Sequence, residues 1–293
     1  MTISALAVTL VVATGLTSAG FDLYQKLLSQ RLTPVQMVFW LGLASIPLFA
    51  IGVMFRGWPA IEAGYWLPAV ISIVLNLAGH IAFVEAVKVS DLSKTVPLLS
   101  LTPVFTSAIG AWLLGERLDT LAIIGVVLVV IGVFWLHTAR GAGPSSRDWF
   151  RLVRDRGAWL MIGTAVAWSI TIPLDKLAVA RSEAFFHGLI LTAGMTLGAF
   201  LLLLRAKERV WRPIVHWRVF VMALLLCVGA LLFQLLALTQ TLAGIVETGK
   251  RSIANVMALV FGRIAFQEEI NRGKLGAVAL MVIGVALILV RPV

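Results

Sequence analysis

Glu247, Lys250 and Arg251 are the residues of this chain best suited to chemistry, because all three fall within one apolar segment. The segment begins near Ala243, so Lys250 lies about seven residues, or ~10 Å, along a helix that rises 1.5 Å per residue. A charge that deep in a membrane is disfavoured by about 2.5–3.5 kcal/mol and needs a partner or a water-filled cavity. Glu247 shares a helical face with both cations and can neutralise one of them. The remaining positive charge predicts a binding site for an anion.

Polar residues in other apolar segments are candidates for the same site. Asn76 and His80 are four positions apart and therefore share a helical face. A membrane histidine can be a packed, hydrogen-bonded residue, but a cationic neighbour equally supports substrate contact or proton coupling. Further lining candidates are Gln234, Trp168 and Thr171.

Two charged pairs near the ends of apolar segments are candidate gates. Asp22 and Lys26 lie near the end of the first segment, and Asp175 and Lys176 near the end of the sixth. If these segments run in opposite directions, the pairs lie at opposite mouths of one cavity. Alternatively, the side chains only extend to the polar membrane interface.

A membrane must position these residues, because the chain is more apolar than one soluble core can bury. Hydrophobic residues make up 60% of its 293 residues, charged residues make up 13%, and the mean hydropathy is +0.99. A helix needs ~20 apolar residues to cross a ~30 Å hydrocarbon core, so the sequence predicts an all-α membrane protein with about ten transmembrane helices. Their expected positions are Ile3–Leu23, Val35–Phe55, Trp66–Val87, Val96–Leu114, Leu121–His137, Ala158–Leu177, Phe185–Leu204, Val219–Leu238, Ala243–Phe266 and Leu275–Val290.

The chain contains one apolar module twice. The stretch Leu101–Leu118 aligns without a gap with Ile253–Ile270, and with a slightly different offset Lys26 aligns with Lys176. Five helices in each copy would place the second copy upside down relative to the first, as in transporters built from inverted repeats. We expect a first five-helix repeat at residues 1–139, a basic linker at 140–157 and a second five-helix repeat at 158–293.

Some repeated residues are expected to serve the fold. Glu116 and Glu268 each stand between two helices, where a carboxylate can accept from the free amides of the following helix. Small residues let membrane helices approach closely, which is the role expected for the repeated glycines. These glycines are Gly125, Gly132, Gly276 and Gly284.

The net charge of +10 reflects membrane orientation rather than nucleic-acid binding. Arginine and lysine residues crowd the links Arg140–Arg156 and Arg205–Arg218, which lie on the same side of a ten-helix protein. The positive-inside rule places that side in the cytoplasm and both termini outside. The single cysteine, Cys227, excludes a disulfide within the chain, and the absence of an Asn-x-Ser/Thr sequon is consistent with a bacterial inner-membrane protein.

The repeated motif resembles that of the EamA-type drug/metabolite transporter superfamily. The resemblance rests on Pro103-Val104-Phe105, Gly110, Leu114-Gly115-Glu116-Arg117-Leu118, Gly125 and Ile131-Gly132. In the second copy, Asn255 replaces the proline, and Gln267-Glu268-Glu269 replaces Gly-Glu-Arg. The resemblance implies an inverted pair of halves around a central cavity.

The pair Lys250-Arg251 also resembles a Lys-Arg pair in the phosphate translocators, a branch of this superfamily that clamps the phosphate of its substrate. The resemblance implies that Lys250 and Arg251 are anion ligands, with arginine as a planar fork and lysine as a point charge. A further lysine of that branch has no counterpart here, because Leu99 stands at its position.

The sequence therefore predicts a secondary transporter that moves a small organic anion, such as a phosphorylated or phosphonate metabolite, by alternating access. An exporter of amino acids or other zwitterions, with Glu247, Lys250 and Arg251 bracketing both charges, is the alternative. An intramembrane enzyme or lipid-handling accessory is a third hypothesis that no catalytic motif supports. The expected partners are the lipid bilayer, the anionic substrate and a coupling proton or counter-substrate, with no cofactor, metal or nucleic acid.

Overall fold

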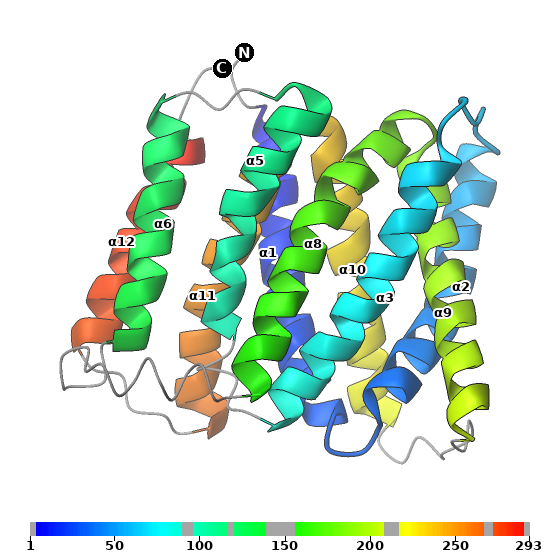
Figure 1. The fold of residues 1–293 in the computed structure, drawn as a ribbon, viewed down its shortest axis with the longest axis horizontal. Coiled ribbons are helices and arrows are strands. Elements are labelled where there is room, and N and C mark those ends of the chain that lie inside the picture. The colour runs from blue at the N-terminus through cyan, green and yellow to red at the C-terminus, as the bar shows by residue number, and fades with distance from the viewer. Residues whose placement is uncertain are drawn as a thin grey trace.

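The computed structural model describes residues 4–89, 96–116, 120–138, 156–207, 217–266 and 272–289, and this part of the chain is entirely helical (Figure 1). It contains ten α-helices and one 3-10 helix, which confirms the predicted all-α fold. The elements are α1 (Ala5–Leu28), α2 (Pro34–Arg56), α3 (Trp66–Val89), η1 (Val96–Leu101), α5 (Thr102–Leu114), α6 (Thr120–Thr138), α8 (Arg156–Ala180), α9 (Ala184–Ala206), α10 (Trp217–Gln240), α11 (Ala243–Phe266) and α12 (Arg272–Leu289).

Local sequence signals set several helix starts. Thr33 caps α2 through a reciprocal pair of hydrogen bonds with Gln36, and Pro34 occupies the first helical position, where its missing N–H costs nothing. Glu183 caps α9 by accepting from the amides of Phe185 and Phe186. These caps satisfy amides that have no partner within the helix.

The helix contacts show two repeats related by inversion. Five crossings separate α1 from its counterpart α8, so the two run in opposite directions. α3 packs extensively on α8, and the equivalent pair α10 and α1 does the same; α1 with α11 mirrors α8 with α5. The remaining major pairs, α2 with α9, α6 with α12 and α5 with α11, join each helix to its own counterpart. The predicted architecture of two inverted five-helix repeats is therefore confirmed.

Glycines bring α6 and α12 together, as predicted. A Cβ atom on Gly132 would lie 2.7 Å from Cγ of Met281 and 2.9 Å from the carbonyl oxygen of Ala277. One on Gly284 would lie 2.7 Å from the carbonyl oxygen of Gly125. Any larger residue would push the two backbones apart.

Six of the described helices are long and apolar enough to cross a membrane by length and composition, namely α1, α2, α3, α8, α9 and α10. Shorter apolar stretches lie in α5, α6 and α12. α11 is long enough at 24 residues, but it carries Glu247, Lys250 and Arg251. These three charges within eight residues of its start distinguish α11 from the six apolar helices and make it the first candidate for a functional site.

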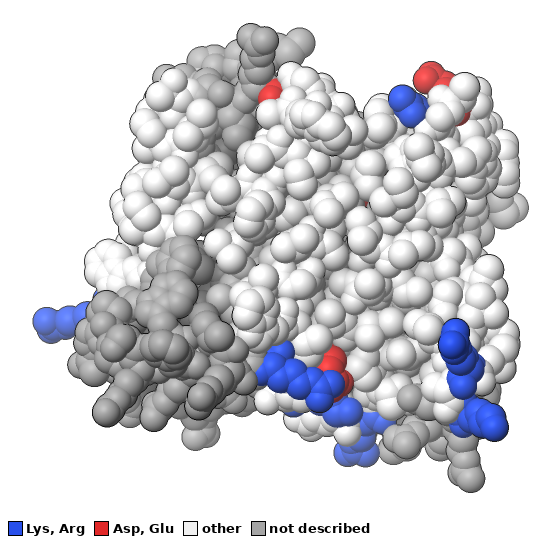
Figure 2. All heavy atoms as spheres, in the orientation of Figure 1, with Lys and Arg blue, Asp and Glu red and all other residues white. Residues whose placement is uncertain are grey.

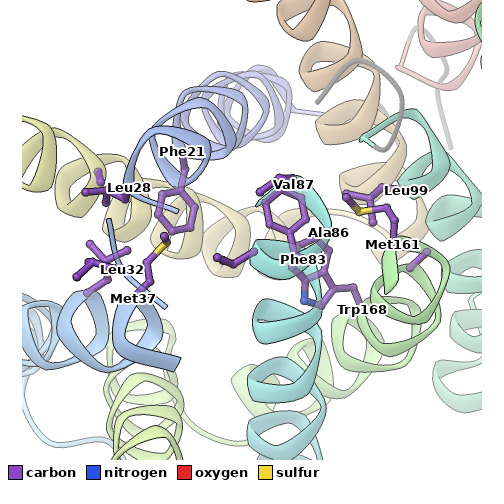
Figure 3. Close-up of a cluster of buried hydrophobic side chains, with 14 of the residues drawn as sticks. Phe21, Leu28, Leu32, Met37, Phe83, Ala86, Val87, Leu99, Met161 and Trp168 are labelled. Carbon is purple, nitrogen blue, oxygen red and sulfur yellow. The ribbon is translucent and has the colours of Figure 1, made fainter. Parts of the chain in front are cut away.

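A large apolar cluster fills the end of the helix bundle at which α1 and α3 end and α2 and α8 begin. It includes Leu28 near the end of α1, Val87 near the end of α3, Met37 at the start of α2 and Met161 at the start of α8. Figure 3 shows these side chains, with Phe21, Phe83, Leu99 and Trp168, converging from several helices. This cluster is called the apolar plug below.

Most of the exposed basic side chains that the structure describes gather at the same end. Figure 2 shows most of the visible lysine and arginine side chains along one edge of the molecule, whereas the middle is free of visible charge. α1 begins and α12 ends at the opposite end (Figure 1). Residues 140–155 of the predicted basic linker, and Glu268, lie outside the described residues.

Candidate functional site

A cavity of about 140 Å³ lies between seven helices in the interior of the bundle. At ~30 Å³ per water molecule in the liquid, it has room for about five waters or one small organic molecule. Six of the predicted substrate-binding residues are on its wall. They are Asn76, His80, Trp168, Gln234, Lys250 and Arg251, and Thr171 joins them.

The predicted cation pair is held by one carboxylate. Lys250 Nζ lies 2.5 Å from Oε2 of Glu247, and Arg251 Nε donates to Oε1 of the same residue at 2.7 Å. Lys250 Nζ also donates to Oε1 of Gln234 at 2.7 Å. Glu247 is fully buried, and Lys250 and Arg251 are only 5% and 2% exposed. Glu247 therefore contacts both cations, where the sequence suggested that it neutralises one.

Aromatic rings support the arginine. The guanidinium carbon of Arg251 lies 5.0 Å from the ring centre of Trp168, which is a cation–π distance. The ring of His80 also contacts Trp168, with ring centres 5.1 Å apart and an interplanar angle of 62°. Because α3, α8 and α11 each contribute one of the three groups, the orientation of Arg251 depends on how these helices pack.

Asp22 lies in the site itself. The structure places this predicted gating residue on the cavity wall, within electrostatic reach of Arg251, Lys250 and Glu247. Its side chain is buried, and Oδ2 has no hydrogen-bond partner among the described residues. Lys26, four residues later, donates to the carbonyl oxygen of Val87 at the end of α3. The two members of this predicted gate therefore face different surroundings.

Asp175 also reaches the cavity wall, and it belongs to a buried polar network. Its Oδ1 accepts from the hydroxyl of Ser72 and lies 3.2 Å from Nε2 of His187. Nδ1 of His187 lies 3.2 Å from the hydroxyl of Tyr65, and Asn76 Nδ2 donates to Ser72 at 3.0 Å. Burial, together with the nearby charge of Asp175, raises the pKa of Tyr65. Its hydroxyl therefore stays protonated.

The residues of this network that the sequence did not predict are Tyr65, Ser72 and His187. The signal that could have found the network is His187, an ionisable residue within an apolar membrane segment. Its partners could not be found in the same way, because Asp175 lies on another helix, 12 positions away, and Tyr65 lies just before α3, 122 positions away.

Lys176, the partner of Asp175 in the second predicted gate, joins the two repeats at the end opposite the apolar plug. Its Nζ lies 2.5 Å from Oε1 of Glu116 and donates to the carbonyl oxygen of Thr241 at 2.8 Å. The same carboxylate accepts from the backbone amide of Ala243 at 3.1 and 3.2 Å. Glu116 thus caps α11 of the other repeat, whereas the sequence had suggested the helix that follows it.

The fold and the central cavity define a polytopic membrane protein of the inverted-repeat transporter class. Residues 5–138 and 155–290 each match the EamA-like transporter family. The chain therefore belongs to that family, whose members are membrane transporters. This confirms the resemblance drawn from the repeated motif.

Comparison with solved structures supports the fold. One of 29 matching chains, described only as the crystal structure of a protein, has a TM-score of 0.67. The match covers 92% of this chain and 96% of that one at 18% identity. No curated protein sequence matches significantly.

Proposed function

We propose that this protein is a secondary transporter that moves a small organic anion, phosphorylated or phosphonate, by alternating access. The observation that carries the proposal is the buried pair Lys250 and Arg251 on the wall of the cavity. Two cations at this depth are costly, and a bound anion would stabilise them further. Asn76, His80, Gln234 and Trp168 would complete the binding site.

The geometry of Arg251 suits a phosphate or phosphonate group. Glu247 engages its Nε. In the described part of the chain, no hydrogen bond occupies its two terminal nitrogens. A guanidinium can present such nitrogens to two oxygens of one tetrahedral anion, and Lys250 can add a point charge.

The alternative, a zwitterionic substrate such as an amino acid, is favoured by one observation at Asp22. Both oxygens of Glu247 already contact the cations, so Glu247 is not available to hold an ammonium group. Asp22 is the carboxylate that can do so, because it lies on the same cavity wall with an unpartnered Oδ2. An aminophosphonate or amino acid would place its anion on Arg251 and its ammonium on Asp22.

Binding of three small probes to the purified full-length protein tests these proposals. Methylphosphonate carries the anion alone, aminomethylphosphonate adds an ammonium group, and glycine replaces the phosphonate with a carboxylate. A ligand at 100 times its Kd stabilises the protein by about 2.7 kcal/mol, which a thermal-shift measurement detects. We expect stabilisation by the phosphonates that Lys250→Gln abolishes. A preference for aminomethylphosphonate that Asp22→Asn removes would support the zwitterion alternative.

The matched control is Arg205→Gln, which neutralises an exposed cation at the end of α9. It should leave phosphonate stabilisation at the wild-type level. Equal stabilisation of Lys250→Gln and wild type by methylphosphonate would show that the cation pair does not bind the anion.

We further propose the bacterial inner membrane as the location, with the repeats at residues 1–139 and 158–293 and the linker at 140–157. The basic end of the bundle faces the cytoplasm in this proposal, because positive charge is retained on that side. A carboxy-terminal phosphatase fusion should therefore be active and a fluorescent protein fusion dark. The reverse result would place the termini in the cytoplasm.

A further inference from the structure

The polar network around Asp175 extends from the cavity wall toward one end of the molecule. Tyr65 immediately precedes α3, at the end opposite the apolar plug, and Asp175 lies on the cavity wall. His187 connects them, with its two ring nitrogens each 3.2 Å from a partner oxygen. Tyr65 and His187 are fully buried, and Asp175 is 1% exposed.

The packing of these helices does not require polar residues at the positions of Tyr65, His187 and Asp175. Apolar side chains surround the network, including Val53, Ala69, Ala178 and Phe186, and they already join α2, α3, α8 and α9. Asp175 is five residues from the end of α8, or ~8 Å along the helix, where an ionisable group is costly. A histidine next to a carboxylate is the arrangement that proteins use to exchange protons near neutral pH.

We propose that Asp175 and His187 form a proton-binding site, which Tyr65 connects to the outer face and which couples substrate movement to proton movement. The proposal rests on the chain being a transporter, but not on which substrate it carries.

Each proton transfer balances along the chain. The Tyr65 hydroxyl passes its proton to Nδ1 of His187 while its oxygen takes up another from the outer side, so the tyrosine stays neutral. His187 releases the proton on Nε2 to Oδ1 of Asp175, so the ring passes from one neutral tautomer to the other. Asp175 becomes a neutral carboxylic acid, and the starting tautomer returns when both protons pass back along the same hydrogen bonds.

The charges facing Asp175 indicate the direction of coupling. Across the cavity, α11 presents Lys250 and Arg251 with Glu247 behind them, and α1 presents Asp22. These four charges cancel, so an ionised Asp175 leaves the cavity with an excess negative charge. Protonation of Asp175 removes that charge and favours an anion. Proton and anion should therefore bind together.

The other groups near Asp175 do not change this sign. They are Tyr65 before α3, His80 from α3, Cys227 from α10, Lys176 within α8, and Arg181 and Glu183 in the turn between α8 and α9. The residues of α2 on the cavity wall carry no titratable side chain. The protonation state of Asp175 affects the binding site through Ser72 and Asn76. The Ser72 hydroxyl donates to Asp175 and accepts from the amide of Asn76. Loss of the charge on Asp175 would free Ser72 and with it the amide of Asn76, which lines the cavity.

Infrared difference spectroscopy of the purified full-length protein, titrated between about pH 5 and about pH 8, measures proton uptake by a buried carboxylate directly. We expect a carboxylic-acid carbonyl band that Asp175→Asn removes and Asp22→Asn retains. His187→Gln should shift its midpoint, which a merely structural residue would not do. A spectrum that Asp175→Asn leaves unchanged would overturn the proposal. If Asp175→Asn does not fold, Ser72→Ala is measured in its place. An unshifted midpoint of the carboxylic-acid band in Ser72→Ala would also overturn the proposal.

Cys227 gives a second readout, because this cysteine lines the cavity. Its labelling by a membrane-impermeant thiol reagent reports cavity access in proteoliposomes. Thiol reactivity itself rises with pH, so the informative quantity is the ratio of the wild-type rate to the Asp175→Asn rate at each pH. We expect this ratio to change about threefold or more between about pH 5.5 and about pH 8. The control Glu62→Gln, at an exposed carboxylate before α3, should follow wild type. A constant ratio would show that protonation of Asp175 does not gate access, and would overturn the proposed coupling.

Discussion

Two segments occupy equivalent places in the two repeats but differ in shape and charge. One is the start of α11, and the other is η1, which leads into α5. Pro103 and Asn255 correspond, as do Leu98 with Lys250 and Leu99 with Arg251. A proline cannot continue a helix, because it lacks an N–H and clashes with the preceding turn. The first copy accordingly enters α5 through the 3-10 helix η1, whereas α11 runs unbroken over 24 residues.

The same two positions serve opposite purposes. Leu98 and Leu99 are buried in the apolar plug near the basic end, whereas Lys250 and Arg251 line the cavity. The fold thus accepts either apolar or charged residues there, provided that the charges have partners. The repeat determines the scaffold, and the departures from the repeat locate the function.

The largest effect is expected when α11 is made to resemble its counterpart. The triple variant Glu247→Gln, Lys250→Leu, Arg251→Leu should lose methylphosphonate binding by about 10²- to 10⁴-fold, because two charge-assisted contacts contribute about 1.5–3 kcal/mol each. Its thermal stability should be unchanged or higher, because an apolar replacement of a buried ion cluster avoids desolvation. Binding measured by calorimetry beside a melting curve checks both expectations. Retained binding would mean that the difference between the repeats is not functional.

Glu247→Gln alone should behave in the opposite way. It leaves two buried cations without their shared carboxylate, and removing one member of a buried ion cluster costs about 3–5 kcal/mol. Tm should fall well below that of the triple variant, and methylphosphonate should restore part of the loss by supplying a negative charge. A mild effect would show that Asp22 and Gln234 are sufficient partners for the cations.

The variant Leu99→Ala tests the apolar segment η1. It should lower the free energy of unfolding by about 2–5 kcal/mol, because it leaves a cavity in the apolar plug. Leu197→Ala is the matched control, since Leu197 is 59% exposed on α9 and its truncation opens no internal cavity. Chemical unfolding of both variants in the same detergent gives the difference. Equal losses would mean that the plug is not tightly packed.

The smallest effect concerns the two ends of the cavity. Lys176 ties Glu116 to α11, and Lys26 ties α1 to the end of α3. Loss of a contact worth ~1 kcal/mol changes a two-state ratio about fivefold. Lys26→Ala and Lys176→Ala should shift the labelling of introduced cysteines in opposite directions, in a Cys227→Ser background. Shifts of the same sign, or none, would make both lysines interfacial anchors.

Local pattern was sufficient to predict the helices and the repeat. Apolar runs of membrane length predicted the crossings to within a few residues, and for α11 the predicted and observed bounds coincide at Ala243–Phe266. The depth of Lys250 and the shared face of Glu247 follow from the helical rise and period alone. The sequence by itself therefore determined the membrane fold, the two copies and the cation pair.

Only the tertiary structure decided which groups meet. A helix that is apolar on all sides has no polar stripe to show which face turns inward, so the sequence could not place Asp22 on the cavity wall. Contacts between helices far apart in the chain were equally hidden, and they joined Glu116 to Ala243 and Asp175 to His187 and Tyr65. Hydropathy fixes where a chain crosses a membrane, whereas the rotation and partners of each helix depend on how all of them pack together.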